Sequence, residues 1–540
     1  MRKAVKRIST IMLTAVLTVI MSVPAMAFAA TVPSASDTST ITVNNVDAGS
    51  TVTAYQIVKA KYNSNGLVGY EKASTSISLA DPVKPTDDEI QAIANGINGG
   101  SISGLTSKTL TGSGTTYSAT VGAGYWLIIA KGGAETIYNP MLAGVYYTVS
   151  GSDNTLSTPN EVNASDYWEL NEGKAWAKSS KPTIDKTITN PGSNGNASGD
   201  DTAIGDVIKF KIATMIPAYS AEYTEVIYNV TDELSEGLDY DADTAVVVKV
   251  GGQEVTAGTD TYSVTQSGQK MTIEFKSAYA LAHAGANVEV TYGAKLNENA
   301  HFNYDANSNK ATTEYSNNPA KSSDTKKIED KTYHYTFEID GNVNGKSTTG
   351  VNYKNHELIK VDEKGAPQKV EYKSDTTYTT IEHGLGGATF KLTNTKTNKE
   401  YFATTNSNGY FEGFKGLDAG TYKLVETAAP KGYTVDSTEH TVVINASYNE
   451  NGTLKEYSIA IDGENTSTYK ATYDEDGVTV KTIEKGTNEQ PTTFIKNTKL
   501  SELPSTGGTG AFLFTIVGVA IMCAIAVLYF RGRKKDNAAE

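Results

Sequence analysis

Short apolar or alternating runs recur along most of the chain and predict β-strands. In the first third, the runs lie at residues 41–43, 52–58, 125–130 and 145–149, and clusters of Asn, Gly and Ser separate them. Strand runs of this length between turn-forming residues are typical of an antiparallel β-sandwich. Residues 31–175 are therefore expected to form a first β-domain.

One helix is expected inside this first domain. Thr86 is followed three residues later by Glu89, which is the spacing of a capping box. Ile90, Ile93 and Ile97 then recur at helical spacing. We therefore predict a helix that begins just after Thr86.

Alternation resumes after a polar, proline-containing stretch at residues 174–198, which is expected to mark a domain boundary. The next strand runs lie at residues 207–212, 245–250, 271–275, 288–292 and 333–339. We expect a second domain at residues 176–345, followed by a linker at residues 345–350. A third β-domain is expected at residues 353–498.

The two ends of the chain carry a different pattern. Residues 511–530 form an uncharged apolar run that is long enough for a helix to cross a bilayer, and a basic tail follows at residues 531–535. The basic tail should stay cytoplasmic, so the preceding domains lie outside the cell. At the other end, basic residues, an apolar stretch at residues 8–23 and small residues near residue 27 predict a signal peptide at residues 1–30.

The composition excludes several kinds of function. The single cysteine, Cys523, lies in the apolar run, so disulfides and thiol chemistry are excluded from the exported part. A formal net charge of -14 argues against nucleic acid as a partner. The six histidines lack paired metal-ligand spacing, and residues 305–309 begin like an EF-hand loop without its Gly and Glu, so we expect a polar turn there. No metal and no cofactor are expected.

A short motif precedes the apolar run and the basic tail: Leu503, Pro504, Ser505, Thr506 and Gly507. In this order and spacing, residues 503–540 resemble the cell-wall sorting signal of Gram-positive surface proteins, which a sortase reads. The resemblance implies cleavage between Thr506 and Gly507. The sortase would hold Thr506 as a thioester on its own cysteine until an amine takes over the Thr506 carbonyl.

The domains resemble those of sortase-assembled pilins. The stretches ITVNNVDAGSTVTAYQIVKA and GYWLII are similar to the first domain of such pilins. In the third domain, HELIKVDEKG, GATFKLTN, GTYKLVETAAPKGYTV and FIKNT resemble successive pieces of a Cna B-type domain, which is a reverse-immunoglobulin sandwich. The implied fold class is all-β, with tandem immunoglobulin-like β-sandwich domains, an N-terminal signal peptide and a C-terminal transmembrane helix.

Domains of this family are cross-linked by an isopeptide bond between a lysine and an asparagine. Burial lowers the pKa of a lysine, so that the neutral amine can attack, and it raises the pKa of a carboxylic acid that assists proton transfer and ammonia release. In the third domain the resemblance assigns Lys360 as the nucleophile, Glu426 as the catalytic acid and Asn497 as the acceptor. Beyond this single-turnover reaction, the chain is not expected to be an enzyme.

For the second domain, the resemblance assigns Lys186 as the lysine and Asp232 as the acid. Asn317 is the preferred acceptor, and Asn318 and Asn309 remain as alternatives. The first domain shows no comparable set of residues, so no bond is expected there.

The amine that receives Thr506 is a separate question. Shaft pilins of this class present a lysine in a motif written Tyr-Pro-Lys-Asn between their first two domains. The matching position here reads Trp176-Ala177-Lys178-Ser179, in which only the lysine keeps the usual letter, and we assign Lys178 as the acceptor. The alternatives are Lys174, Lys181 and Lys354.

These features lead us to expect the structural shaft subunit of a covalent cell-surface pilus that supports adhesion. Expected partners are pilus-specific and housekeeping sortases, identical pilin subunits, minor pilins, peptidoglycan and a host surface ligand. The expected location is the cell wall and surface of a Gram-positive bacterium. The alternative is a monomeric wall-anchored adhesin, or a minor pilin, that binds a host protein or glycan.

Overall fold

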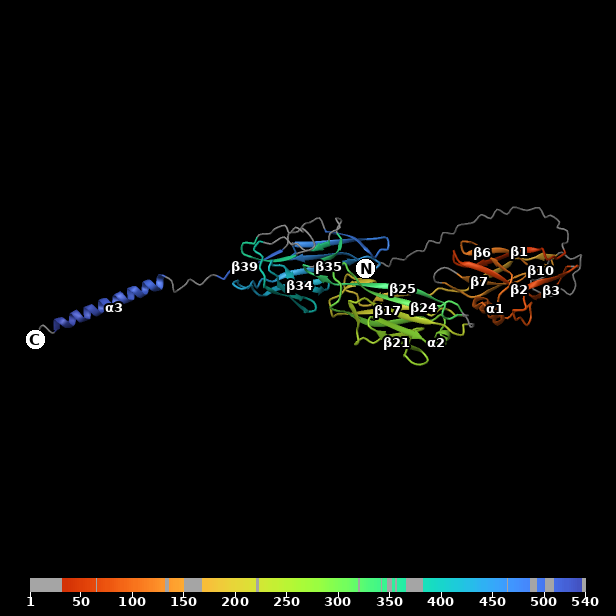
Figure 1. Cartoon of the computed structure of the whole chain (residues 1–540), viewed down its shortest axis with the longest axis horizontal. Coiled ribbons are helices and arrows are strands. Elements are labelled where there is room, and N and C mark those ends of the chain that lie inside the picture. The colour runs from red at the N-terminus through yellow and green to blue at the C-terminus, as the bar shows by residue number, and fades with distance from the viewer. Residues whose placement is uncertain are drawn as a thin grey trace, which may run out of the picture. The chain divides into compact units, whose positions relative to one another are not determined.

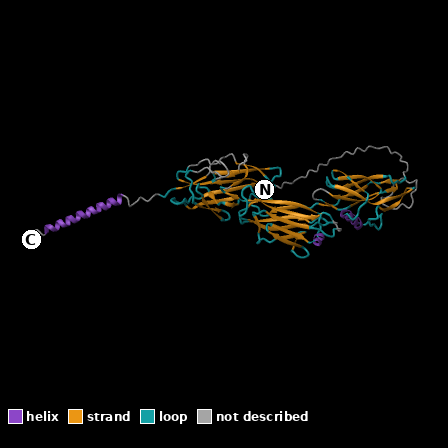
Figure 2. Cartoon of the chain, viewed as in Figure 1, coloured by secondary structure: helices purple, strands orange, loops and turns teal. Residues whose placement is uncertain are grey.

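The computed structural model places the chain in two compact units. The first unit ends at Ser180 and the second begins at Lys181. Strands predominate in both units (Figure 1, Figure 2), which confirms the predicted all-β class. The described residues are 32–64, 66–131, 136–149, 168–219, 223–318, 321–340, 342–346, 352–354, 357–365, 382–463, 465–485, 493–500 and 509–536.

The first unit is a β-sandwich with one main helix. Its elements are β1 (Thr38–Asn44), β2 (Thr51–Asn63), β3 (Gly66–Lys72), α1 (Asp87–Gly99), β4 (Ser107–Thr109), β5 (Thr111–Ser113), β6 (Thr116–Gly122), β7 (Gly124–Lys131), β8 (Ile137–Tyr138), β9 (Met141–Val145), β10 (Tyr147–Val149), β11 (Trp168–Leu170), β12 (Gly173–Trp176) and β13 (Ser179–Ser180). One sheet has the order β12-β1-β6-β5 and the other β3-β2-β7-β9, with β4 paired to β2. Side chains that alternate inward, such as Ile41, Val52 and Trp126, form the core between the sheets.

Helix α1 begins where the sequence predicts. The Thr86 hydroxyl accepts a hydrogen bond from the Glu89 amide at 3.3 Å, and the Glu89 carboxylate accepts one from the Thr86 amide at 2.9 Å. This reciprocal pairing is a capping box, so the predicted start is confirmed. Ile93 on the inner side of α1 packs with Ile57 and Leu127 of the sheet.

The second unit starts with a middle sandwich. Its elements are β14 (Ile184–Ile188), β15 (Gly199–Asp201), β16 (Val207–Met215), β17 (Tyr228–Leu234), β18 (Leu238–Tyr240), β19 (Val247–Val250), β20 (Gln253–Val255), β21 (Tyr262–Ser267), β22 (Lys270–Phe275), α2 (Ser277–Ala282), β23 (Asn287–Leu296), β24 (Asn307–Ser316) and β25 (Thr325–Tyr335). One sheet has the order β14-β16-β23-β19-β20, with β18 paired to β23. The other has the order β15-β25-β24-β17-β22-β21, part of which is labelled in Figure 1.

A C-terminal sandwich completes the second unit. Its strands are β26 (Phe337–Glu338), β27 (Asn342–Lys346), β28 (Asn352–Lys354), β29 (Leu358–Asp362), β30 (Thr389–Asn394), β31 (Glu400–Thr405), β32 (Phe411–Glu412), β33 (Lys415–Leu417), β34 (Gly420–Ala428), β35 (His440–Tyr448), β36 (Leu454–Ile461), β37 (Asn465–Tyr473), β38 (Val480–Lys485) and β39 (Thr493–Asn497). An 8-stranded sheet has the order β32-β31-β30-β34-β35-β36-β37-β38, while β29 and β39 pair in parallel.

The middle and C-terminal sandwiches pack against each other through a shared hydrophobic cluster. Tyr304 and Tyr335 of the middle sandwich belong to the same buried cluster as Tyr457 of the C-terminal sandwich. The Tyr304 hydroxyl donates to the Tyr469 carbonyl at 2.7 Å, and the Tyr335 hydroxyl accepts from the Leu454 amide at 3.1 Å. The two sandwiches are therefore packed together, and a division at about residue 345 stays a prediction.

Helix α3 (Thr509–Asp536) contains the predicted apolar run. Among the described residues it is the one helix long and apolar enough to cross a membrane, over Leu513–Arg531. The predicted signal peptide at residues 1–30 and the motif at residues 503–507 lie outside the described residues.

The expected polar turn at residues 305–309 is wrong from Asn307 onward. Strand β24 begins there, and the side chains of Asn307 and Asn309 are buried. Polar side chains can occupy a buried strand when they have hydrogen-bond partners. The Asn307 amide group donates to the His301 and His334 carbonyls, at 2.9 and 3.3 Å.

Candidate functional site

The structure brings together the three side chains predicted in the C-terminal sandwich. Lys360 on β29 donates from Nζ to Oδ1 of Asn497, which lies on the parallel neighbour β39. Asn497 Nδ2 donates to Oε1 of Glu426, on β34 of the 8-stranded sheet, at 2.9 Å. Lys360 Nζ is 3.5 Å from the same Oε1 and 5.3 Å from the centroid of the Phe390 ring. All three reacting side chains are buried.

The electrostatic environment of Lys360 shifts its pKa. Burial lowers the pKa of Lys360, although the charge of Glu426 and its hydrogen bond act in the opposite direction. The second carboxylate oxygen of Glu426 accepts a hydrogen bond from the Asp436 amide at 2.6 Å, which fixes the orientation of the carboxylate. The amine, the amide and the acid therefore meet in a site buried from solvent, which is the kind of arrangement that proximity catalysis uses.

The middle sandwich contains a comparable cluster around Lys186. Lys186 on β14 donates from Nζ to Oδ2 of Asp232, on β17 of the facing sheet, and to the hydroxyl of Tyr292 on β23. The Tyr292 hydroxyl donates to the same Oδ2 at 2.6 Å. Lys186 also lies 5.0 Å from the centroid of the Phe210 ring. Burial lowers the pKa of Lys186, while the charge of Asp232 raises it.

The structure does not bring Asn317, the preferred acceptor, to this cluster. The Asn317 side chain donates to Asp324 Oδ1 at 3.1 Å, in the loop beyond β24, and Asn318 donates to the other oxygen of Asp324 at 3.3 Å. Asn309 is fully buried, and its Nδ2 donates to the Tyr292 hydroxyl at 3.1 Å. In the register of β24 and β17, Asn309 pairs with Leu234 and is the diagonal neighbour of Asp232.

Lys178 lies between β12 and β13 at the end of the first unit and is exposed. Its carbonyl accepts a hydrogen bond from the Asn139 amide at 3.0 Å. The preceding Ala177 donates to the Asn44 carbonyl at 2.9 Å and accepts from the Asn45 side chain at 3.0 Å. The backbone around Lys178 is thus fixed to the sandwich, while Trp176 two residues earlier is 64% exposed.

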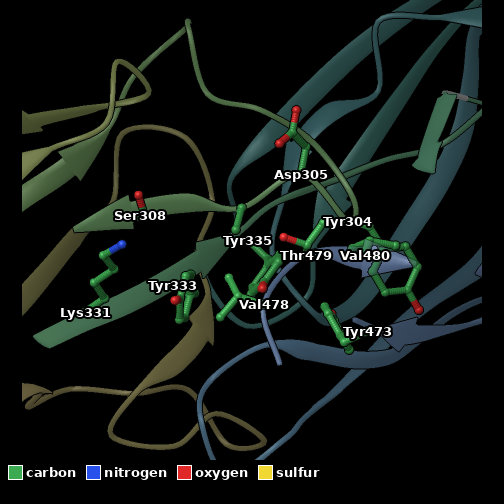
Figure 3. A pocket seen from close by; sticks show the side chains of 11 residues that line it. Tyr304, Asp305, Ser308, Lys331, Tyr333, Tyr335, Tyr473, Val478, Thr479 and Val480 are labelled. Atoms are coloured by element: carbon green, nitrogen blue, oxygen red, sulfur yellow. The ribbon is translucent and has the colours of Figure 1, made fainter. Parts of the chain in front are cut away.

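A cavity of about 400 Å³ lies where the middle and C-terminal sandwiches pack. Figure 3 shows tyrosines from both sandwiches around it, among them Tyr304, Tyr333 and Tyr473, with Asp305 and Lys331 as charged neighbours. The Tyr304 and Tyr473 hydroxyls donate to backbone carbonyls, so both rings are held in place. Among the described residues, no group of three or more His, Cys, Asp or Glu side chains could hold a metal ion.

Sequence reasoning missed Tyr292 and ranked Asn309 below Asn317. Asn309 shares its parity along β24 with the buried Ala311 and Tyr315, whereas Lys310 and Glu314 lie on the other face. This alternation was a usable signal for Asn309. No such signal marks Tyr292, because an aromatic residue at an inward strand position is ordinary core.

Comparisons with known proteins agree with this architecture. Family models match at four places: a T6 antigen Ig-like domain at residues 36–179, a Cna-B-like domain of Gram-positive pilin backbone subunit 2 at residues 204–319, a prealbumin-like fold domain at residues 368–459 and an LPXTG cell wall anchor motif at residues 495–537. The structure of the T6 backbone pilin of serotype M6 Streptococcus pyogenes has the same fold, with a TM-score of 0.61 at 23% identity, over 87% of this chain and 100% of that chain.

These domains and the anchor define a cell-wall-anchored surface protein of the backbone-pilin class, made by a Gram-positive bacterium. The trypsin-resistant surface T6 protein of Streptococcus pyogenes serotype M6 is 30% identical over 545 residues, which cover 92% of this chain and 95% of that protein. The chain belongs to the family of this T6 protein. It is therefore a structural pilus shaft subunit and a sortase substrate, as the sequence predicts.

Proposed function

We propose that a pilus-specific sortase joins the Thr506 carbonyl of one subunit to Nζ of Lys178 in the next, and that a housekeeping sortase attaches the base of the polymer to peptidoglycan. A donor at the C-terminus and an acceptor at the end of the first unit form a heterologous contact, which repeats into an open polymer. Minor pilins and a host surface ligand would be partners of the finished fibre.

The position of Lys178 is the observation that carries this proposal. The lysine is exposed on a backbone that hydrogen bonds hold against the first sandwich, so a sortase would meet an accessible amine at a fixed place on the chain. Among the described residues no carboxylate forms an ion pair with Lys178, whereas Lys174 lies 3.5 Å from Glu172. Lys178 is therefore the preferred nucleophile of the two.

The test asks whether variants that each lack one lysine still polymerise on the cell wall. Lys178→Ala should abolish the ladder of polymers and leave wall-attached monomer, because the thioester then meets only the peptidoglycan amine. Lys174→Ala is the matched control, and it should polymerise normally. Tandem mass spectrometry of wall extracts should find Thr506 joined to Lys178.

Two outcomes would contradict the acceptor assignment. A normal ladder from Lys178→Ala would show that another amine receives Thr506. Thr506 found on peptidoglycan and never on a pilin lysine would favour the monomeric wall-anchored adhesin instead.

We also propose that both clusters form isopeptide bonds, Lys360 to Asn497 and Lys186 to Asn309. Asn309 replaces Asn317 in this proposal because Asn309 is buried beside Tyr292, which also contacts Lys186, whereas the Asn317 side chain is bonded to Asp324. Each bond would form by attack of a neutral lysine on the amide with release of one ammonia.

Alanine variants of the two asparagines separate these assignments. Asn309→Ala should retain the mass of one ammonia in the intact protein, and Asn317→Ala should not. A digest should contain the Lys186 peptide joined to the Asn309 peptide. If Asn309→Ala still loses the ammonia of the middle sandwich and Asn317→Ala retains it, Asn317 is the acceptor.

A further inference from the structure

Among the described residues of the middle cluster, Tyr292 is the one that forms hydrogen bonds with all three reactants proposed above, Lys186, Asp232 and Asn309. Its hydroxyl accepts hydrogen bonds from Lys186 Nζ and from Asn309 Nδ2, the latter at 3.1 Å, and donates to Asp232 Oδ2 at 2.6 Å. The side chain is buried, and its ring stacks on Phe210 with centroids 5.4 Å apart. The hydroxyl is therefore fixed between the amine, the acid and the amide.

The acid of the middle cluster does not contact the amide. In the described part of the chain, the Asp232 carboxylate accepts hydrogen bonds from Lys186, Tyr292 and Tyr240, and none from Asn309. In the C-terminal cluster, by contrast, Asn497 Nδ2 donates directly to Glu426 at 2.9 Å. The reaction needs a proton on the departing nitrogen, so the middle cluster needs a group that carries a proton from Asp232 to Asn309.

We propose that Tyr292 is a catalytic residue that relays this proton. The inference rests on the proposed bond between Lys186 and Asn309. The lone pair of neutral Lys186 Nζ forms a bond to the Asn309 side-chain carbonyl carbon, and the proton lost by Nζ passes to Asp232 Oδ2. The Tyr292 hydroxyl gives its proton to Asn309 Nδ2 and takes the one held by Asp232. The bond between carbon and Nδ2 then breaks, ammonia leaves, and the tyrosine hydroxyl is restored.

The surroundings of Tyr292 favour a role as a proton relay rather than as a general base. Burial and the charge of Asp232 raise the pKa of Tyr292 well above its usual value, so the hydroxyl stays protonated. A hydroxyl with such a raised pKa can give up its proton only if it receives another proton at the same time. Asn309 Oδ1 is buried without a hydrogen-bond partner in the described part of the chain, which leaves Tyr292 as the side-chain group that orients the amide.

The test compares two Tyr→Phe variants of the full chain. Tyr292→Phe keeps the ring beside Phe210 and removes the hydroxyl. Tyr240→Phe is the matched control, because the Tyr240 hydroxyl donates to Asp232 Oδ1 at 2.9 Å, whereas Lys186 and Tyr292 donate to Oδ2. The chains are synthesised in a cell-free system, quenched at timed intervals, and followed by intact mass and by the Lys186–Asn309 cross-linked peptide.

Tyr292→Phe should slow the middle cross-link by at least about 100-fold, the lower range for general acid–base catalysis. Tyr240→Phe should slow it far less, because Lys186 and Tyr292 still hold Asp232 Oδ2 and the path to Asn309 is intact. The C-terminal cross-link should form normally in both variants and serves as an internal measure of folding. Wild-type rates in Tyr292→Phe, or equal slowing in both variants, would overturn the relay.

The remaining outcomes are also decisive. If Asn309→Ala still loses the middle-domain ammonia, the acceptor assignment is wrong and the relay to Asn309 fails with it. A wild-type rate in Tyr292→Phe, with the Lys186–Asn309 peptide present, overturns the relay alone. If Tyr292→Phe fails to fold, a fluorinated tyrosine at position 292 keeps the shape and has a more acidic hydroxyl. A changed rate of cross-linking with that residue supports the relay, and an unchanged rate overturns it.

Discussion

In the C-terminal sandwich, the lysine donates a hydrogen bond directly to the amide oxygen of its asparagine, whereas in the middle sandwich a tyrosine hydroxyl stands between the two. Lys360 and Asn497 lie on neighbouring parallel strands of one sheet, and the acid comes from another sheet. Lys186 lies on one sheet, while Asp232 and its diagonal neighbour Asn309 lie on the other.

This difference in topology explains the extra residue in the middle cluster. Lys360 pairs with Ile495, so Asn497 is its diagonal neighbour on the adjacent strand. Diagonal neighbours lie roughly 7–8 Å apart, a distance that a long lysine side chain can span to meet the asparagine directly. Facing sheets lie about 10 Å apart, and the space between them must be filled by side chains. Tyr292 fills part of that space and supplies the polar contact. The two sites share residue types and a buried lysine, but they need different proton paths.

The largest expected effects come from removing each acid. Glu426→Ala should leave the C-terminal sandwich without its bond and the middle sandwich cross-linked, and Asp232→Ala should do the reverse. Each variant should retain the mass of one ammonia. Losing the bond between Lys360 and Asn497, which are 137 residues apart, should also lower the free energy of unfolding by about 5 kcal/mol on the chain-entropy model.

Peptide mapping distinguishes the two acids. The Lys360–Asn497 peptide should be absent only from Glu426→Ala, and the Lys186–Asn309 peptide only from Asp232→Ala. Full cross-linking of both sandwiches in either variant would show that the carboxylate in question is not needed.

The second prediction concerns pulling force. Asn497 ends β39, and beyond the cross-link the described chain keeps only a short pairing of residues 498–500 with residues 432–434. In the middle sandwich, residues 310–336, which include β25, follow Asn309 and lie outside the cross-linked loop. These 27 residues should peel away under load and lengthen the molecule by about 90 Å, at roughly 3.4 Å per residue.

Single-molecule force spectroscopy of the shaft can measure this step. The matched variant is Asn309→Ala, whose middle sandwich should unfold over a much longer distance because no bond limits it. A wild-type chain that shows no step from the middle sandwich, or a step of the full domain length, would contradict the position of the bond at Asn309.

The features that could be predicted from the sequence are those that depend on residues close together in the chain. Alternation located the strands, and the capping box located the start of α1. The stretches around Lys360, Glu426 and Asn497 are local motifs, and the structure brings these residues together. For Asn309, Asn317 and Asn318, alternation marks Asn309 as inward-facing, but which residues Asn309 meets depends on the register of β24 against β17, which no local motif encodes. The same holds for Tyr292, whose hydroxyl acquires partners only when two sheets face each other.

The smallest predicted effect is an acid sensitivity confined to the middle sandwich. His334 is fully buried there, and this burial is the main cause that lowers its pKa from 6.5 to about 3. Between these two values the unfolded chain binds a proton that the folded chain does not, so stability is lost as the pH falls below about 6.5. Acidification from about pH 6.5 to about pH 4.5 should cost about 2 kcal/mol through this residue.

His334→Gln isolates this contribution, because the difference between wild type and variant removes the effects of the carboxylates that titrate in the same range. The stability of the wild type should fall more steeply with acid than that of the variant, as measured by hydrogen exchange of the middle sandwich. The C-terminal sandwich provides the comparison within the same molecule, since its described histidines, His383 and His440, form hydrogen bonds with Asp362 and Asp462 near the surface. Parallel pH profiles for wild type and His334→Gln would show that His334 binds a proton in the folded state and is not the source of acid sensitivity.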